Sequence, residues 1–164
     1  MSSAVRRRVV ELIDTSVLLN LLGTPFESDD AADVGVELER RAREGVELRM
    51  PLAALVEAGG HVERIDDGTR RRECATRLQT LIEATLDGRA PWGFAPMTWD
   101  ALLLRDAISM PGADLVTSLT NKHLEMGDLV ILAELRRLRR NLDERVVVVK
   151  LWTLDAQLAA AASV

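Results

Sequence analysis

Four acidic residues that lie far apart in the sequence occupy positions that parallel-sheet proteins use for chemistry: Asp14, Glu57, Asp128 and Asp155. Asp14 ends an apolar run that is typical of a buried strand, and Asp155 closely follows a second such run. Glu57 lies in the first two turns of a helix expected after another strand. Asp128 opens a helix, on the same side as its apolar residues. Because the carboxyl ends of parallel strands meet at one edge of a sheet, we expect the four carboxylates to converge there.

Such a group of acids is typical of a metal centre. Carboxylates packed together repel one another and raise each other's pKa values unless a cation compensates. Oxygen-only ligation suits Mg²⁺ or Mn²⁺ better than zinc, and Cys74, His61 and His123 form no Cys/His pair at zinc-like spacing. These metals turn water into hydroxide near neutral pH and stabilise charge on the attacking and leaving oxygens. The sequence therefore predicts metal-assisted hydrolysis of phosphodiester bonds.

Hydroxyl groups flank two of the acids. Thr15 and Ser16 directly follow Asp14, and Thr153 precedes Asp155 by two residues. Thr15 or Ser16 can cap the next helix, while Thr153 can hydrogen-bond a metal ligand or simply end its strand. Asp14 can itself be an ordinary helix cap, and the placement of the other acids is what favours a site.

Two further residues near the acids have competing interpretations. His61 lies one turn beyond Glu57 on the same helix face, where it can contact a phosphate, orient Glu57 or remain a solvated histidine. Glu63 is further from the strand end, so Glu57 is preferred as the acid of this helix. Glu125 precedes Asp128 by three residues. We interpret it as a solvated or capping residue, with a place in the acidic site as the alternative.

Alternating strand and helix patterns position these residues. Apolar runs bounded by turn residues predict strands near residues 9–13, 46–50, 92–95 and 145–150. Helical patterns cover residues 17–22, 28–44, 52–65, 69–86, 99–109, 113–119, 128–140 and 156–162. Thr98 is the expected cap of the helix over 99–109. The alternation implies right-handed βαβ units and a parallel sheet, and so an α/β fold.

Composition narrows the class of protein. The 164 residues suit a single domain, 1–164, with a core over about residues 9–162. No apolar run is long enough to span a membrane, so no membrane partner is expected. Cys74 is the only cysteine, which excludes an internal disulfide and favours a cytoplasmic location.

The charge balance bears on nucleic acid as a partner. The net charge of −5 argues against such a partner, but four of the negative charges belong to the expected site, where a metal would offset them. The densest basic cluster is Arg136, Arg137, Arg139 and Arg140. It can hold RNA phosphates or an acidic partner, although a solvated face near the carboxyl end of a helix is the preferred interpretation.

Four segments, taken in order, resemble the motifs of a PIN domain. They are Ile13-Asp14-Thr15-Ser16, Leu52-Ala53-Ala54-Leu55-Val56-Glu57, Gly127-Asp128-Leu129-Val130-Ile131-Leu132-Ala133-Glu134 and Thr153-Leu154-Asp155. Each segment alone is weak, but the ordered set extends from Val9 to Ala162 and is fairly specific. Within this family, the set is similar to the bacterial ribonucleases resembling VapC toxins.

The resemblance implies a three-layer α/β/α fold around a central parallel sheet of about five strands. It also implies Mg²⁺- or Mn²⁺-dependent endonucleolytic cleavage of single-stranded or structured RNA. Asp14, Glu57, Asp128 and Asp155 would be the catalytic, metal-binding quartet, and Ser16 or Thr15 would support Asp14. His61 fits a Glu-x-Gly-Asn-His pattern of one PIN subgroup, except that Gly60 replaces the Asn. Family members are often homodimers, and the toxins pair with an antitoxin protein whose tail blocks the site.

Other classes of protein fit less well. A phosphoacceptor signalling domain would carry paired acids after the first strand, and a haloacid-type phosphatase would carry a second Asp where Ser16 stands. The serious alternative is a non-catalytic PIN-like module that binds RNA or a protein. Retention of all four acids argues against it, because an unneutralised acidic cluster carries an electrostatic penalty. A free-standing RNA-processing enzyme and a toxin both agree with the nuclease interpretation.

Overall fold

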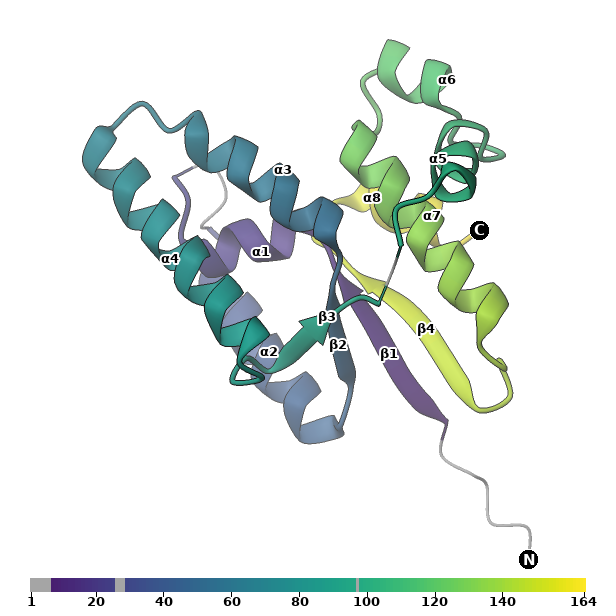
Figure 1. Cartoon of the computed structure of the whole chain (residues 1–164), viewed down its shortest axis with the longest axis horizontal. Helices are drawn as coiled ribbons and strands as arrows, with labels where there is room; N and C mark the ends of the chain where they lie inside the picture. The colour runs from purple at the N-terminus through teal and green to yellow at the C-terminus, as the bar shows by residue number, and fades with distance from the viewer. Residues whose placement is uncertain (1–6, 26–28, 97) are drawn as a thin grey trace, which may run out of the picture.

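The computed structural model describes residues 7–25, 29–96 and 98–164 of the chain (Figure 1). Its strands form one parallel sheet in the spatial order β3-β2-β1-β4. In chain order they are β1 (Arg8–Ile13), β2 (Glu47–Met50), β3 (Trp92–Phe94) and β4 (Val147–Trp152). The predicted parallel sheet is confirmed. The count of about five strands, which came from the resemblance, is not confirmed, because the described residues form four.

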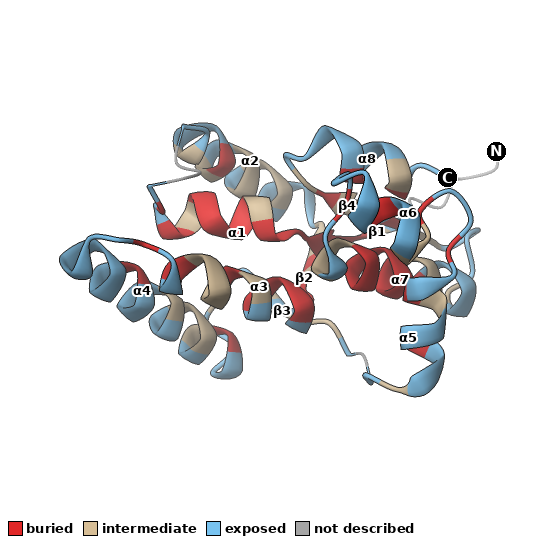
Figure 2. Cartoon of the chain, turned by 90° about the horizontal axis from the view of Figure 1, so that it is seen from above, coloured by how far each residue is buried: buried red, intermediate tan, exposed pale blue. Residues whose placement is uncertain are grey.

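Helices flank both faces of the sheet. In the described part of the chain they are α1 (Thr15–Leu22), α2 (Ala31–Glu44), α3 (Leu52–Glu63), α4 (Gly68–Leu86), α5 (Ala101–Ile108), α6 (Leu115–Thr120), α7 (Met126–Asn141) and α8 (Ala156–Ala162). Figure 2 shows α1, α2 and α8 on one side of the sheet and α3, α4 and α7 on the other. This arrangement is an α/β fold compatible with three layers. None of the described helices is both long enough and apolar enough to cross a membrane.

The central strand β1 brings two chain segments to the same edge of the sheet. It pairs with β2 on one side and with β4 on the other. Its residues Val10, Leu12 and Ile13 have no exposed surface, as expected for a parallel strand covered by helices on both faces. Ile13 lies opposite Trp152, and the next backbone N–H, that of Asp14, donates to the Trp152 carbonyl at 3.0 Å. The register therefore places the residues after β1 beside those after β4.

Helix α7 packs into the core and fixes the other side of this edge. Leu129, Ile131, Leu132 and Leu135 are fully buried, and the helix contacts α3, α5 and β4. The backbone N–H of Glu125 donates to Asp128 Oδ2 at 2.8 Å, which stabilises the first turn. The packed core thus holds the start of α7 against α3.

Several element boundaries differ from the sequence prediction by a few residues. Strand β4 begins at Val147 and not near Arg145, because a turn precedes it in which the Asp143 carbonyl accepts from Val147 N at 2.9 Å. Helix α5 begins at Ala101, because Asp100 and not Thr98 is its cap, with Asp100 Oδ1 accepting from Leu103 N at 2.8 Å. The predicted helix start at residue 28 lies outside the described residues, and α2 begins at Ala31.

Candidate metal centre

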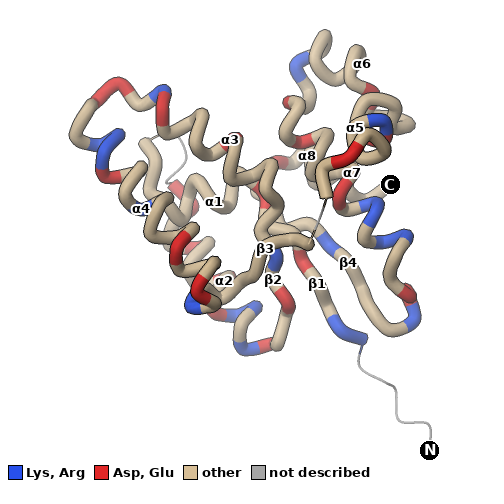
Figure 3. The backbone as a smooth tube through the Cα atoms, in the orientation of Figure 1, with Lys and Arg blue, Asp and Glu red and all other residues tan. Residues whose placement is uncertain are grey.

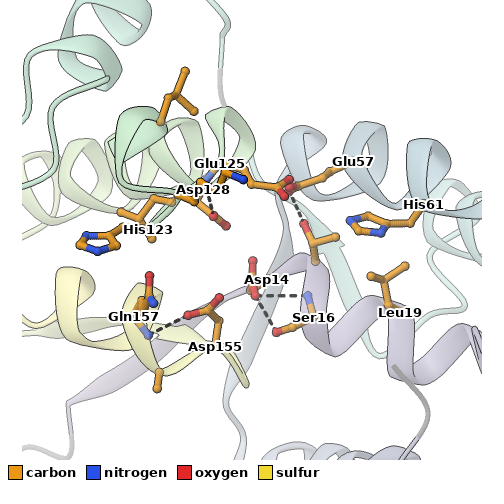
Figure 4. Close-up of a pocket in the computed structure, with 15 residues that line it drawn as sticks. Asp14, Ser16, Leu19, Glu57, His61, His123, Glu125, Asp128, Asp155 and Gln157 are labelled. Atoms are coloured by element: carbon orange, nitrogen blue, oxygen red, sulfur yellow. Dashed lines mark hydrogen bonds between the residues drawn. The ribbon is translucent and has the colours of Figure 1, made fainter. Parts of the chain in front are cut away.

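The four predicted acids line one cavity of about 700 Å³ at the carboxyl edge of the sheet (Figure 4). Asp14 follows β1, and Asp155 is the N-cap of α8, three residues after β4. Glu57 lies in the second turn of α3, and Asp128 lies in the first turn of α7. Four separate elements therefore each contribute one carboxylate to the wall of the cavity.

Asp14 is the most buried of these acids, with 2% of its surface exposed. Its Oδ2 accepts hydrogen bonds from Ser16 Oγ at 2.6 Å, Ser16 N at 3.2 Å and Thr153 Oγ1 at 2.7 Å. Its Oδ1 is also buried, but has no hydrogen-bond partner among the described residues. A buried carboxylate oxygen without a donor is costly, and a cation at the cavity wall would compensate it. This observation fits the donor set of a metal site.

The Asp14 hydrogen bonds also connect it to Asp155. Thr153 Oγ1 donates to Asp14 and accepts from Asp155 N at 3.0 Å, while Ser16 Oγ accepts from Leu154 N at 3.0 Å. Asp155 Oδ1 accepts from two backbone N–H groups at the start of α8, at 2.7 and 2.9 Å. The hydroxyls of Ser16 and Thr153 thus hold the ends of β1 and β4 together at the cavity.

Thr15 supports a different acid from the one expected. Its Oγ1 donates to Glu57 Oε2 at 2.7 Å, whereas Ser16 serves Asp14. Of the caps that the sequence allowed for α1, the structure uses Asp14 and not Thr15 or Ser16. Glu57 in turn lies against Gly127, where an added Cβ would come within 2.4 Å of Glu57 Oε2. A side chain at position 127 would therefore require this carboxylate to shift.

Burial shifts the ionisation of two of the acids. It raises the pKa of Glu57 to about 8, helped by the charges of Asp128 and Glu125 and opposed by the Thr15 hydrogen bond. Burial also raises the pKa of Asp128 to about 7, opposed by the Glu125 N–H and helped by the charges of Asp14 and Asp155. A divalent cation in the cavity would return both groups to the ionised form.

One group of the described residues has ligand atoms close enough for a single ion. Glu57, His61 and Glu125 each offer one such atom, and all three atoms lie within 4.8 Å of one another. Glu57 is therefore the one predicted acid in this group. Glu125, interpreted from the sequence as solvated or capping, is exposed but belongs to the group. In the sequence, the indication that Glu125 could belong to the site was its position three residues before Asp128. Its proximity to Glu57 on α3 is a tertiary contact, which the sequence pattern does not reveal.

The loop between α6 and α7 adds residues that the sequence analysis did not propose for the site. Lys122 and His123 also line the cavity, and Lys122 is its one lysine or arginine among the described residues. Lys122 has a φ of 53°, a left-handed conformation that is uncommon outside glycine. Since this strained residue carries the only fixed positive charge of the cavity, it is suited to contact an anionic ligand.

Figure 3 shows basic positions along α7, and ion pairs of the arginine cluster connect this helix to its neighbour α5. Arg137 pairs with Asp100 at 2.9 Å and Arg140 with Asp106 at 2.5 Å, which ties α7 to α5. Arg139 donates to the carbonyls of residues 149 and 162 at 3.2 and 2.8 Å. Three of the four arginines therefore have partners within the chain, although Arg139 and Arg140 are also exposed to solvent.

Comparisons with family models, with curated proteins and with solved structures give no match for this chain. The resemblance to PIN-domain ribonucleases therefore stays a prediction from the ordered sequence motifs.

Proposed function

We propose that this protein is a metal-dependent endoribonuclease of the PIN type. The observation that carries the proposal is the convergence of Asp14, Glu57, Asp128 and Asp155 on one cavity, in which Asp14 Oδ1 is buried without a hydrogen-bond partner among the described residues. A buried oxygen of this kind among further carboxylates calls for a cation of high charge. Mg²⁺ and Mn²⁺ match an oxygen-rich donor set.

The residues of the cavity take distinct roles under this proposal. Asp14, Asp128 and Asp155 hold Mg²⁺ or Mn²⁺, with Glu57 as the fourth acid. The bound metal supplies hydroxide from water near neutral pH and stabilises charge on the phosphoryl oxygens. Ser16 and Thr153 orient Asp14 through its Oδ2, which leaves Oδ1 for the metal side of the cavity.

Phosphate binding depends on the balance of charge in the cavity. Its lining contains five acidic residues, counting Glu125, against a single lysine, Lys122. An RNA phosphate would be repelled by this lining unless a divalent cation offsets it. Under this proposal Lys122 contacts a phosphate, and RNA cleavage requires metal for binding as well as for chemistry.

The partners follow from the resemblance alone. A second copy of the chain and, in the case of a toxin, an antitoxin protein are the partners that we propose with the nuclease function. Analytical ultracentrifugation of the purified protein tests the first. Copurification with the product of a neighbouring gene tests the second.

The decisive experiment is cleavage of a mixed RNA pool with Mg²⁺, Mn²⁺ or EDTA, comparing the wild type with Asp14→Asn. Asparagine still caps a helix, so the variant keeps the start of α1 while it removes the charge. Asp67→Asn is the matched control, because Asp67 also caps a helix but lies outside the cavity. We expect cleavage that needs metal and Asp14 and is unchanged in Asp67→Asn.

Two outcomes would contradict the proposal. Cleavage that survives in Asp14→Asn would exclude the predicted centre. A folded wild-type protein that binds RNA without cutting it, at any metal concentration, would instead support the non-catalytic module.

A further inference from the structure

The group of Glu57, His61 and Glu125 lies at one end of the acidic cavity. Figure 4 shows Glu57 between Glu125 at the start of α7 and His61 on α3. Glu57 and His61 are four residues apart, so they share one face of the helix. Their ligand atoms and that of Glu125 lie within 4.8 Å of one another, so the three side chains could together hold one metal ion.

The central residue of this group is held firmly in place. Thr15 Oγ1 donates to Glu57 Oε2 at 2.7 Å, and the missing side chain at Gly127 leaves space for the carboxylate. Helices α3 and α7 pack against each other, which brings Glu125 to Glu57. The half-buried Glu57 is therefore positioned by helix packing and a hydrogen bond, while Glu125 joins it from the exposed start of α7.

A second observation indicates that the same cavity takes cations. Asp14 Oδ1 is buried without a hydrogen-bond partner and faces the cavity between Asp128 and Asp155 (Figure 4). Asp14 does not belong to the group of Glu57, His61 and Glu125. The unpartnered Asp14 oxygen and the donor group of Glu57, His61 and Glu125 therefore lie at two different places in the same cavity.

We propose that the cavity has two cation positions of different chemistry: an oxygen-only position at Asp14, and a nitrogen-containing position formed by Glu57, His61 and Glu125. The second position deepens the proposed nuclease function, on which its biological role rests, but its existence can be measured without any substrate. His61 is the residue that distinguishes the two.

The ligand types set different metal preferences. Mg²⁺ takes oxygen ligands and water, so it suits the position at Asp14. A neutral imidazole favours first-row transition metals over Mg²⁺. We therefore expect the His61 position to take Mn²⁺ in preference to Mg²⁺.

The test is Mn²⁺ binding followed by electron paramagnetic resonance of the full-length protein. Titration counts the bound ions, and pulsed spectra detect the ¹⁴N coupling of an imidazole ligand. The wild type is expected to bind two Mn²⁺ ions, one of them coupled to ¹⁴N and retained in excess Mg²⁺. His61→Ala is expected to lose that coupling and to weaken the second ion by about 10-fold or more, as for other losses at metal sites.

Matched variants separate the two positions. His123→Ala is the control, because His123 also lines the cavity but is not part of the donor group, and it should keep both ions and the coupling. Asp14→Asn should lose the oxygen-only ion and keep the ¹⁴N-coupled one. Glu125→Gln should weaken the ¹⁴N-coupled ion by about 10-fold and leave the other unchanged.

Absence of ¹⁴N coupling in the wild type, or its persistence in His61→Ala, would overturn the inference. Its failure is distinguishable from failure of the proposed function. Asp14-dependent RNA cleavage without ¹⁴N coupling removes only the second position. A ¹⁴N-coupled Mn²⁺ in a protein that cuts no RNA would contradict only the proposed nuclease function.

Discussion

Helix α7 carries two acids in unlike surroundings, Asp128 in its first turn and Glu134 six residues further on. Burial raises the pKa of each to about 7. Asp128 faces a cavity that Asp14 and Asp155 also line. Glu134 has no exposed surface, and its hydrogen bond is a single donation from Trp99 Nε1 to Oε1 at 3.2 Å. The two acids therefore share a raised pKa, but Asp128 faces a cavity with other acids and Glu134 is enclosed in the core.

The comparison shows which property singles out a candidate site. An oxygen without a hydrogen-bond partner does not, because Glu134 Oε2 is unpartnered and buried just as Asp14 Oδ1 is. A raised pKa does not either, since structural burial produces the same shift. The distinguishing property is the convergence of acids from separate elements on a shared cavity. The hydrogen bond to the Glu134 carboxyl group comes from the Trp99 indole. Burying the charged form of Glu134 therefore destabilises the folded chain, and no converging group of acids marks a ligand site there.

The largest expected contrast is in catalysis. Asp128→Asn should lower metal-dependent RNA cleavage by roughly 10²- to 10³-fold, because it removes a charge from the metal centre while Asn can still accept the Glu125 N–H. Glu134→Gln, a substitution of the same kind on the same helix, should leave the cleavage rate within about twofold. Single-turnover cleavage rates at saturating Mn²⁺ measure both.

Equal losses of activity in the two variants would break the comparison. Circular dichroism spectra of both proteins control for a change in fold. If Glu134→Gln alone lost activity, the chemistry would have to be sought beneath Trp99 and not at the sheet edge.

The second contrast concerns how the free energy of unfolding depends on pH. The pKa of Glu134 is about 7 when folded, against 4.5 for the free side chain. Between these pH values the unfolded chain has lost the proton and the folded chain keeps it. The free energy of unfolding therefore falls as pH rises, by about 1.4 kcal/mol per unit, and is constant above pH 7. Glu134→Gln removes this loss, so the variant should gain about 3 kcal/mol over the wild type at pH 8 and nothing near pH 4.5.

Urea unfolding of both proteins from pH 4.5 to 8 measures the difference. EDTA is present throughout, so that metal binding at the cavity does not contribute. A stability difference that is constant across this range would show that Glu134 is not protonated at neutral pH in the folded protein.

The positions of Asp14 and Asp155 were accessible from the sequence for a physical reason. Apolar runs mark buried strands, and their ends mark the sheet edge in a parallel fold. The same patterns predicted four strands, and the described residues form four. The expectation of about five came only from the resemblance.

The rest of the site depends on contacts that no local pattern encodes. Lys122 and Glu125 lie in the segment between α6 and α7, which has no periodicity, and Glu125 meets Glu57 only because α3 packs against α7. The cap of α5 shows the same limit at short range. Thr98 and Asp100 are both residue types that cap helices. Asp100 is the cap in the structure, where it accepts a hydrogen bond from Leu103 N and forms an ion pair with Arg137.

The third prediction tests how tightly the cavity end of α7 is built. A Cβ at position 127 would lie 2.4 Å from Glu57 Oε2 and 2.7 Å from its Cδ. Gly127→Ala must therefore displace the Glu57 carboxylate, and we expect metal affinity to fall about 10-fold, as for other disturbances beside metal ligands. Gly35→Ala is the matched control, because Gly35 is also helical and has no neighbour within 4 Å of the added carbon.

Metal titration by calorimetry compares the two glycine variants. The control should bind metal like the wild type and gain slightly in stability, since alanine is the better helix former. Unchanged affinity in Gly127→Ala would mean that Glu57 can move without consequence and is not a ligand.

The smallest expected effect concerns the hydrogen bond that Trp99 donates to Glu134. Trp99→Phe removes the indole N–H and keeps an aromatic ring. The charged form of Glu134 therefore loses the hydrogen bond that Trp99 donates to it. The folded pKa of Glu134 should rise further, and the stability loss should be about 1 kcal/mol above pH 7 and smaller near pH 4.5, where the carboxyl is neutral.

Trp92→Phe supplies the internal control for that pH dependence. Trp92 Nε1 donates to the hydroxyl of Thr85 at 3.0 Å, a group that does not titrate in this range. Its loss should therefore cost the same at pH 4.5 and at pH 8, while the cost of Trp99→Phe grows with pH. If both tryptophan variants lost stability in parallel, the indole at position 99 would act through packing alone. Glu134 would then take its shifted pKa from burial without any modulation by its neighbour, whereas the pKa of Asp128 is raised by burial and further by the charges of Asp14 and Asp155.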